Sequence, residues 1–299
     1  MKILTIFILH LVFLFGFLQL SLAQDRQDAI KSRIETLDGN EYIGVVLEQT
    51  PEKIRLKTEK LGEIVISVAD IKHISELKLV TNKDGSYWLD NPQATRYLWA
   101  PNGYNLKKGE GYYQNVWALF NQAVYGFTDH FSAGVGVVPL FIIAGAPTPV
   151  WITAKFAVPV VENKFNLGAG ALMGTVIGEE NATFGILYGI STFGTKDKNL
   201  SVGLGWGFAG GEISQNPTVN ISGIIRTGAK GYLITENYLI GTPDNFLVLM
   251  SFGGRRIIKN VGLDFGAFIP IGADVGSFLA IPWLGLSIPF GTKPSFKKR

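Results

Sequence analysis

The feature that most constrains this chain is a two-residue alternation within its glycine-rich C-terminal two-thirds. In residues 200–210, Leu, Val, Leu, Trp and Phe share one face, and Ser, Gly and Ala share the other. A half-buried strand of a water-soluble protein would carry charged or long polar side chains on its wet face. Large residues facing lipid and small ones facing a crowded lumen explain the pattern better. The alternation therefore predicts strands of a transmembrane β-barrel.

The same alternation recurs along residues 94–291, and short turns separate the segments. Clear cases are residues 131–137, 165–175 and 261–269. About eleven segments lie between Gly111 and Gly291, and residues 94–101 supply a twelfth. The predicted fold class is an all-β, antiparallel up-and-down barrel of about twelve strands, with ten as the alternative. Lipid cannot satisfy backbone amides, so the sheet has to close.

Two features of this region require further interpretation. Pro139 and Pro282 fall inside predicted strands, where each removes a donor from the ladder, so bulges or different boundaries are needed. Aromatic residues near predicted strand ends are typical of interfacial girdles, and ordinary aromatics of a β-core are the alternative. They are Tyr112, Tyr113, Trp117, Tyr125, Trp151, Tyr232, Tyr238 and Trp283.

The N-terminus has the pattern of a secretory signal. Lys2 precedes an apolar stretch, and Ser21-Leu22-Ala23 offers small residues for cleavage after Ala23. Residues 1–23 are therefore predicted to be a signal peptide, with an uncleaved helical anchor as the alternative. After residue 23 no run of 18 or more apolar residues appears, as expected for a chain that crosses a membrane with strands.

A water-soluble module is predicted between the signal and the barrel. Of the 36 glycines, 29 lie at or after Gly111, whereas charged residues are concentrated before it. Residues 30–79 contain about five short alternating segments with turns at 37–40 and 60–63, a pattern that resembles small Sm-like or SH3-like β modules. Polar residues 80–93 are predicted to be a linker, and residues 292–299 a basic tail.

Three stretches carry a resemblance to a wider group. Residues 95–101, residues 106–113 and the hairpin-like Tyr-Gly-Phe-Thr-Asp-His-Phe-Ser of residues 125–132 resemble uncharacterised outer-membrane barrel proteins of Bacteroidota. The resemblance covers about residues 94–290. It implies location and architecture, and it transfers no catalytic or binding residue.

Charged residues inside the predicted strands are the best candidates for a site. Lys155, Arg226, Arg255 and Asp264 fall on the inward faces, and the orientation of Glu236 is unsettled. An Arg or Lys on the lipid face would cost ~2–4 kcal/mol near the midplane, so these groups should face the lumen and pair with one another. A lumen-filling ion network is the main interpretation, and selection or binding of a solute is the alternative.

Other chemistry has little support in the sequence. The absence of cysteine excludes disulfides, thiolate metal sites and a lipid-modified N-terminal cysteine. Only His73 and His130 remain after the signal, so neither a metal site nor a Ser-His-acid hydrolase is predicted, although Ser132 follows His130 closely. Residues 205–210 match Gly-x-Gly-x-x-Gly, but a loop follows instead of a helix. No cofactor, nucleic acid or enzyme activity is expected.

Three functions remain open from the sequence. One is an outer-membrane barrel acting as a narrow channel or in solute uptake. Another is a closed structural, adhesive or envelope-anchoring barrel whose N-terminal module binds a partner; an enzyme acting on lipid or glycan is the weaker third. The expected location is the outer membrane of a Gram-negative bacterium, with the module in the periplasm. The expected partners are the lipid bilayer, the outer-membrane assembly machinery and an unidentified envelope component.

Overall fold

The computed structural model describes most of the chain after residue 27. The described residues are 28–58, 61–81, 87–89, 91–241, 246–258, 260–271 and 279–291. They divide into two compact units, one up to residue 89 and one from residue 91 onward. The predicted signal peptide and the predicted basic tail lie outside the described residues.

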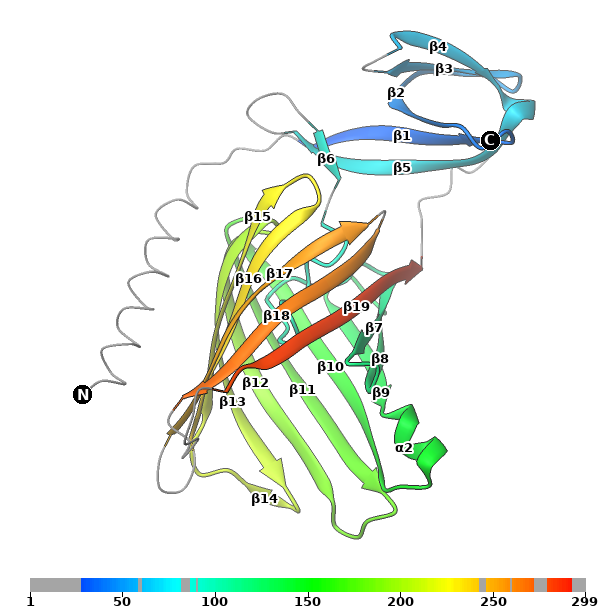
Figure 1. The fold of residues 1–299 in the computed structure, drawn as a ribbon. Helices are drawn as coiled ribbons and strands as arrows, with labels where there is room; N and C mark the ends of the chain where they lie inside the picture. The colour runs from blue at the N-terminus through cyan, green and yellow to red at the C-terminus, as the bar shows by residue number, and fades with distance from the viewer. Residues whose placement is uncertain are drawn as a thin grey trace. The chain divides into compact units, whose positions relative to one another are not determined.

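The second unit is a closed antiparallel barrel of twelve spanning strands (Figure 1). They are β7 (Glu110–Val116), β8 (Phe120–Gly126), β9 (Phe131–Val137), β10 (Thr148–Val161), β11 (Phe165–Ile177), β12 (Thr183–Thr195), β13 (Lys198–Ala209), β15 (Thr218–Gly228), β16 (Gly231–Gly241), β17 (Phe246–Ile258), β18 (Val261–Ile271) and β19 (Ile281–Gly291). Each strand pairs with its neighbours in sequence, and β19 pairs with β7 from Gly285↔Val116 to Gly291↔Glu110. The predicted fold class is confirmed.

The connections at one end of the barrel contain two small elements. The short strand β14 (Glu212–Ile213) pairs with the end of β13. The helix α2 (Pro139–Ala144) separates β9 from β10 and has Pro139 in its first turn. The prediction that Pro139 lies within a strand is therefore wrong, because a proline fits the first helical turn without loss of a hydrogen bond. Pro282 does lie in a strand, opposite Ala267 near the start of β19.

The wall of the barrel presents two contrasting faces. On β13 the side chains of Val202, Leu204 and Trp206 point outward and are 42–43% exposed, whereas Ser201, the residue before Val202, is fully buried. Among the described residues of the twelve spanning strands, Arg256 is the one charged residue that is exposed, and it lies two residues before the end of β17. An exterior that is apolar at mid-height suits a lipid environment.

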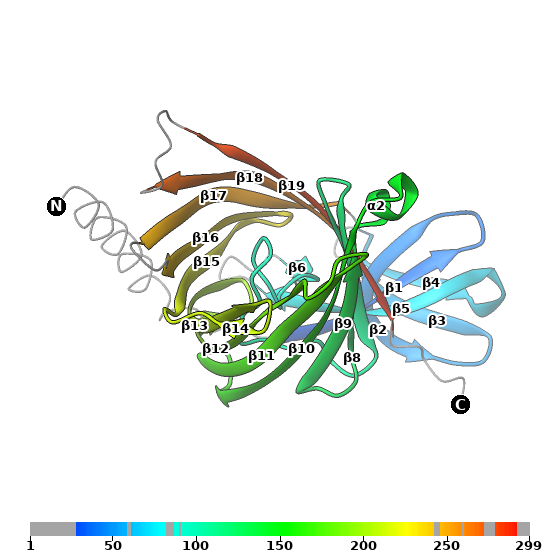
Figure 2. The same cartoon turned by 90° about the horizontal axis from the view of Figure 1, so that it is seen from below.

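Residues 91–109 do not form a barrel strand. The predicted twelfth segment, residues 94–101, contains only an isolated bridge between Arg96 and Pro101, and the barrel obtains all twelve strands from residue 110 onward. This inner segment, as we call residues 91–109, lies inside the ring of strands, as Figure 2 shows in teal. Its buried Tyr97 and Leu98 pack into an apolar core with Ile224, Ile234 and other wall residues.

The inner segment explains why the girdle interpretation is wrong for most of the proposed aromatics. Five of them point into the lumen and are buried or half-buried: Tyr112, Trp151, Tyr232, Tyr238 and Trp283. Trp117 and Tyr125 are exposed at 37% and 39%. Because the lumen holds a packed segment, inward positions can be apolar as well as polar.

The two ends of the barrel differ in the length of their connections. At the end where β7 begins and β19 ends, the other strands are joined by two to four residues, as in residues 162–164 and 196–197. At the opposite end the connections run from three to ten residues, and the longest contains α2. Among the described residues, no helix is long and apolar enough to cross a membrane.

The first unit is a separate curled antiparallel sheet in the order β4-β3-β2-β1-β5-β6. Its elements are β1 (Asp28–Thr36), β2 (Glu41–Gln49), β3 (Lys53–Thr58), β4 (Glu63–Ser67), the 3-10 turn η2 (Val68–Asp70), β5 (Ile71–Thr81) and β6 (Tyr87–Leu89). The meander with its last long strand beside the first is the predicted small β module. Ile34, Ile54, Leu56 and Ile66 form its core. Residues 87–89 of the predicted linker form β6.

Candidate functional site

The interior of the barrel holds the densest polar network of the described chain, and the inner segment lies at its centre. Side-chain hydrogen bonds join this segment to nine of the twelve spanning strands, namely β7, β9, β10, β12, β13, β16, β17, β18 and β19. Strands on every side of the ring are thus involved. A segment on the outside of a barrel could not reach them all, so the network establishes that residues 91–109 fill the lumen.

The strongest anchor is a buried triad of two arginines and one aspartate. Asp264 on β18 accepts from Arg255 Nε at 2.5 Å and from Arg96 Nη1 at 2.9 Å, and all three residues are at most 1% exposed. Arg96 also donates to Ser287, and Arg255 Nη1 donates to the Gln93 carbonyl at 2.9 Å. Such groups tolerate burial because nearly every donor finds an acceptor. The triad ties the inner segment to β17, β18 and β19.

A second ion pair lies at the end with short connections. Arg226 on β15 donates to both carboxylate oxygens of Asp197, at 3.1 and 3.2 Å. The Tyr232 hydroxyl donates to the same carboxylate at 3.1 Å. Asp197 belongs to the turn between β12 and β13, so the strand pattern alone did not single it out. Because Nη1 of Arg226 contacts both oxygens of Asp197, this ion pair joins the β12–β13 turn to the neighbouring strand β15 at this end of the barrel.

Lys155 and Glu236 bind backbone groups of the inner segment in place of an opposite charge. Lys155 Nζ on β10 donates to the carbonyls of Tyr104 at 2.6 Å and Thr95 at 3.1 Å. Glu236 on β16 is fully buried and accepts the amides of Trp99 at 2.9 Å and Ala100 at 3.0 Å. The orientation that the sequence left unsettled for Glu236 is therefore inward.

Tyrosines of the inner segment add neutral contacts. Tyr97 Oη donates to Asn199 Oδ1 and lies 2.6 Å from Ser201 Oγ on β13. Tyr104 Oη donates to the Gly194 carbonyl at 2.6 Å.

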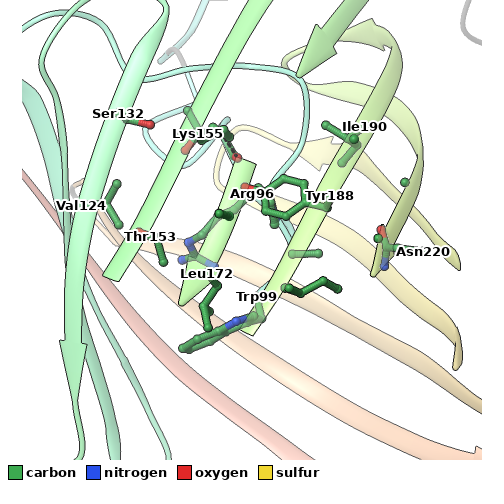
Figure 3. A pocket seen from close by; sticks show the side chains of 18 of the residues that line it. Arg96, Trp99, Val124, Ser132, Thr153, Lys155, Leu172, Tyr188, Ile190 and Asn220 are labelled. Atoms are coloured by element: carbon green, nitrogen blue, oxygen red, sulfur yellow. Dashed lines mark hydrogen bonds between the residues drawn. The ribbon is translucent and has the colours of Figure 1, made fainter. Parts of the chain in front are cut away.

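A cavity of about 170 Å³ separates the inner segment from one part of the wall. Figure 3 shows Arg96 of the inner segment between Thr153 and Tyr188 of the wall. Apolar side chains of Val124, Leu172, Ile186 and Ile190 supply much of the surface, and the cavity is only partly enclosed. Its lining residues include the cations Arg96 and Lys155 and no carboxylate.

The four candidates from the sequence are all in this interior. Lys155, Arg226, Arg255 and Asp264 are at most 8% exposed. Arg255 forms an ion pair with Asp264, whereas Arg226 forms one with Asp197 and Lys155 donates hydrogen bonds to backbone carbonyls. A role of these residues in selecting a solute stays a prediction. Arg96 and Asp197 could not be singled out from the sequence, because the partners of Arg96 lie far along the chain and Asp197 lies in a turn.

The other motifs do not come together as a reactive site. His130 is exposed in the turn after β8, while Ser132 is buried and donates to Asn105 of the inner segment. Residues 205–210 lie at the end of β13, with no helix following. Among the described residues, no group of three His, Cys, Asp or Glu side chains is placed to hold a metal ion.

Comparisons with known proteins add little to this geometry. No family model matches the chain, and no curated protein matches it. Among solved structures, KdgM porin in complex with disordered oligogalacturonate is similar with a TM-score of 0.45 and 9% identity, over 61% of this chain and 98% of that one. The outer-membrane expressed OmpT of Vibrio cholerae is similar with a TM-score of 0.31 and 10% identity, over 91% of this chain and all of that one. Likenesses this distant carry no functional argument, and the strand pairing alone establishes the fold.

Proposed function

We propose that this chain is an outer-membrane barrel that is closed by its own inner segment and that its small N-terminal module lies in the periplasm. The observation that carries the proposal is the set of hydrogen bonds between residues 91–109 and nine strands. A packed segment with buried ion pairs leaves no wide aqueous path. The envelope-anchoring alternative is therefore favoured over an open channel, and the resemblance to Bacteroidota barrels stays a prediction.

The outer-membrane location follows from the two faces of the wall. An apolar exterior around a closed antiparallel barrel is the form that bacterial outer-membrane proteins take, and the secretory signal predicted for residues 1–23 would deliver the chain to the envelope. Nine of the twelve spanning strands have 11–14 residues, which meets the ~9–11 residues needed to cross, whereas β7, β8 and β9 have seven each.

The connection lengths support one orientation of the barrel in the membrane. Barrels of this class have short turns on the periplasmic side and longer loops outside. The short-turn end also holds the start of β7 and the end of β19. The N-terminal module, which precedes β7 in the chain, is therefore assigned to the periplasm, where it would bind an envelope component.

Planar-bilayer recording tests the closed state. The purified wild-type protein should show no stable open step, whereas Arg96→Ala, which removes one arginine of the buried triad, should loosen the inner segment and produce intermittent openings. Lys107→Ala is the matched control, because Lys107 belongs to the same segment but its side chain is 52% exposed. A stable, large step in the wild type would contradict the closed barrel and restore the channel.

Cysteine labelling tests the orientation, and the chain contains no cysteine to give a background. A membrane-impermeant maleimide should label Glu180→Cys, in the connection between β11 and β12, in intact cells. It should label Lys164→Cys in a short turn, and Lys57→Cys in the module, only after the outer membrane is permeabilised. The opposite pattern would invert the orientation.

A further inference from the structure

The cavity beside the inner segment has the composition of a ligand site. Ligand sites in proteins are mostly apolar and have a few polar groups that fix orientation. Here Leu172, Ile186 and Ile190 of the wall and Trp99 of the inner segment provide an apolar surface. All four lie on the inward side of the ring, so lipid does not cover them. The apolar surface of the cavity is therefore separate from the apolar surface that faces lipid.

The charge at the cavity has one sign. Arg96 and Lys155 line it, and no Asp or Glu does. Arg96 shares the single carboxylate of Asp264 with Arg255, so that triad holds two positive charges for one negative charge. Lys155 Nζ binds carbonyl oxygens of Thr95, Asn102 and Tyr104, which solvate its charge without neutralising it.

Arg96 also has hydrogen-bonding capacity left over. Its side chain is 1% exposed, and its two terminal nitrogens donate to Asp264, Ser287 and backbone carbonyls. Its Nε–H finds no acceptor among the described residues. A buried donor without a partner costs free energy, and an anionic acceptor would remove that cost.

The size of the cavity limits the ligand. A dry apolar cavity of about 150 Å³ accommodates benzene, and the cavity here is about 170 Å³ and partly open. It therefore suits an apolar chain or ring of roughly six to ten carbon atoms. Neutral polar side chains such as Thr153 and Asn220 complete the lining.

We propose that this cavity binds an amphipathic monocarboxylate, whose apolar part packs against Leu172, Ile186 and Ile190 and whose carboxylate lies toward Arg96 and Lys155. The inference rests on the proposed closed barrel, because the inner segment forms one wall of the site. It gives the barrel a binding function in addition to holding the periplasmic module.

Equilibrium dialysis of radiolabelled decanoate against the full-length protein in lipid nanodiscs tests the proposal, with empty discs of the same lipid as the blank. Decanoate should bind in excess of the blank. Decanol should compete about tenfold more weakly, because it lacks the charge-assisted contact, and decyltrimethylammonium should compete no better than decanol. Equal competition by decanol, or no binding above the blank, would overturn the proposal.

Two adjacent residues of β12 provide a matched pair. Ile186→Trp fills the cavity and should weaken decanoate binding by about tenfold or more. Leu187→Trp adds the same ring to the lipid-facing side, where Leu187 is 56% exposed, and should leave binding unchanged. Equal loss in both variants would show that the ligand sits in the lipid and not in the cavity.

The role of the positive charge is tested by Lys155→Met, with Lys155→Arg as the conservative variant and the gel mobility of the folded barrel as the check on folding. In folded Lys155→Met the preference for decanoate over decanol should fall, and in Lys155→Arg it should persist. If folded Lys155→Met still prefers decanoate to decanol, the placement of the ligand carboxylate near Lys155 is wrong. If Lys155→Met does not fold, the competition by decanol against the wild-type protein is the test of the carboxylate contact. If decanoate does not bind and the bilayer recordings of the wild-type protein show no open step, the binding proposal is wrong but the proposal of a closed barrel still holds.

Discussion

The N-terminal module and the barrel are both antiparallel sheets, but their exposed faces are opposite in character. On β3 of the module, Lys53, Arg55 and Lys57 are exposed while Ile54 and Leu56 are buried. On β13 of the barrel Val202, Leu204 and Trp206 are exposed, while Ser201, Gly203 and Gly205 are buried. The same alternation of side chains therefore serves two solvents, water for the module and lipid for the barrel.

The comparison extends to where each unit keeps its charges. The ion pairs of the module are at its surface, as between Lys72 and Glu35, and this contact with Lys72 lowers the pKa of the Glu35 carboxyl. The spanning strands of the barrel keep most of their charges inside, as in the triad around Asp264. Surface pairs contribute little to stability, whereas removing one member of a buried set leaves a charge without compensation.

The largest expected effect is the loss of the buried carboxylate. Asp264→Ala leaves two buried arginines without an anion and should lower the free energy of unfolding by about 3–5 kcal/mol. Urea titration of folding into lipid vesicles, followed by gel mobility, measures it. Glu35→Ala in the module is the comparison and should change little. If both variants lost equal stability, the contrast between interior and surface charges would not hold.

The stability cost of a lysine introduced on the exposed face should show whether lipid or water surrounds that face. Phe265 lies in the middle of β18 and is 52% exposed, so Phe265→Lys should cost ~2–4 kcal/mol if lipid surrounds it. Val65 on β4 of the module is 61% exposed, and Val65→Lys should change stability by less than about 0.5 kcal/mol. The same urea titration compares them. A tolerated Phe265→Lys would remove the case for a lipid-facing exterior.

The smallest expected effect concerns the turns. In the module a glycine takes the left-handed position of the first hairpin, Gly39 at φ +85°, whereas Trp117 and Ala118 take such positions between β7 and β8, at φ +54° and +59°. Ala118→Gly should therefore stabilise the barrel by ~1 kcal/mol, and Gly39→Ala should destabilise the module by a similar amount. Thermal unfolding of each variant measures the difference. A destabilised Ala118→Gly would mean that the alanine methyl makes a contact worth more than the strain.

The alternation of side chains was enough to predict the barrel, its approximate strand number and the faces of its strands. Val202, Leu204 and Trp206 face outward as their spacing predicted, because period two is a local property of an extended chain. The alternation does not show which residues the inward face contacts. Because the position of Trp151 and Trp283 near strand ends does not reveal their contacts, the sequence predicts interfacial residues, whereas both point into a filled lumen.

The inner segment could not be recognised from its own residues. Residues 94–101 alternate well enough to suggest a strand, and their destination depends on partners far along the chain. Arg96 binds Asp264 and Ser287, which are 168 and 191 positions away. No local pattern encodes such a pairing, and the predicted domain boundary at residue 94 could not distinguish a first strand from a segment inside the barrel.

The pairing of β19 with β7 also sets an order of events during biogenesis. The seam joins the first spanning strand to the last, so the ring remains unsealed until the C-terminal strand has arrived. Residues 91–109, which precede β7, are encircled once the seam forms. They must already occupy the interior by then or thread into it afterwards, at the cost of breaking the buried polar network. A newly exported molecule would therefore need protection along two unpaired strand edges until its final eleven-residue strand is in place.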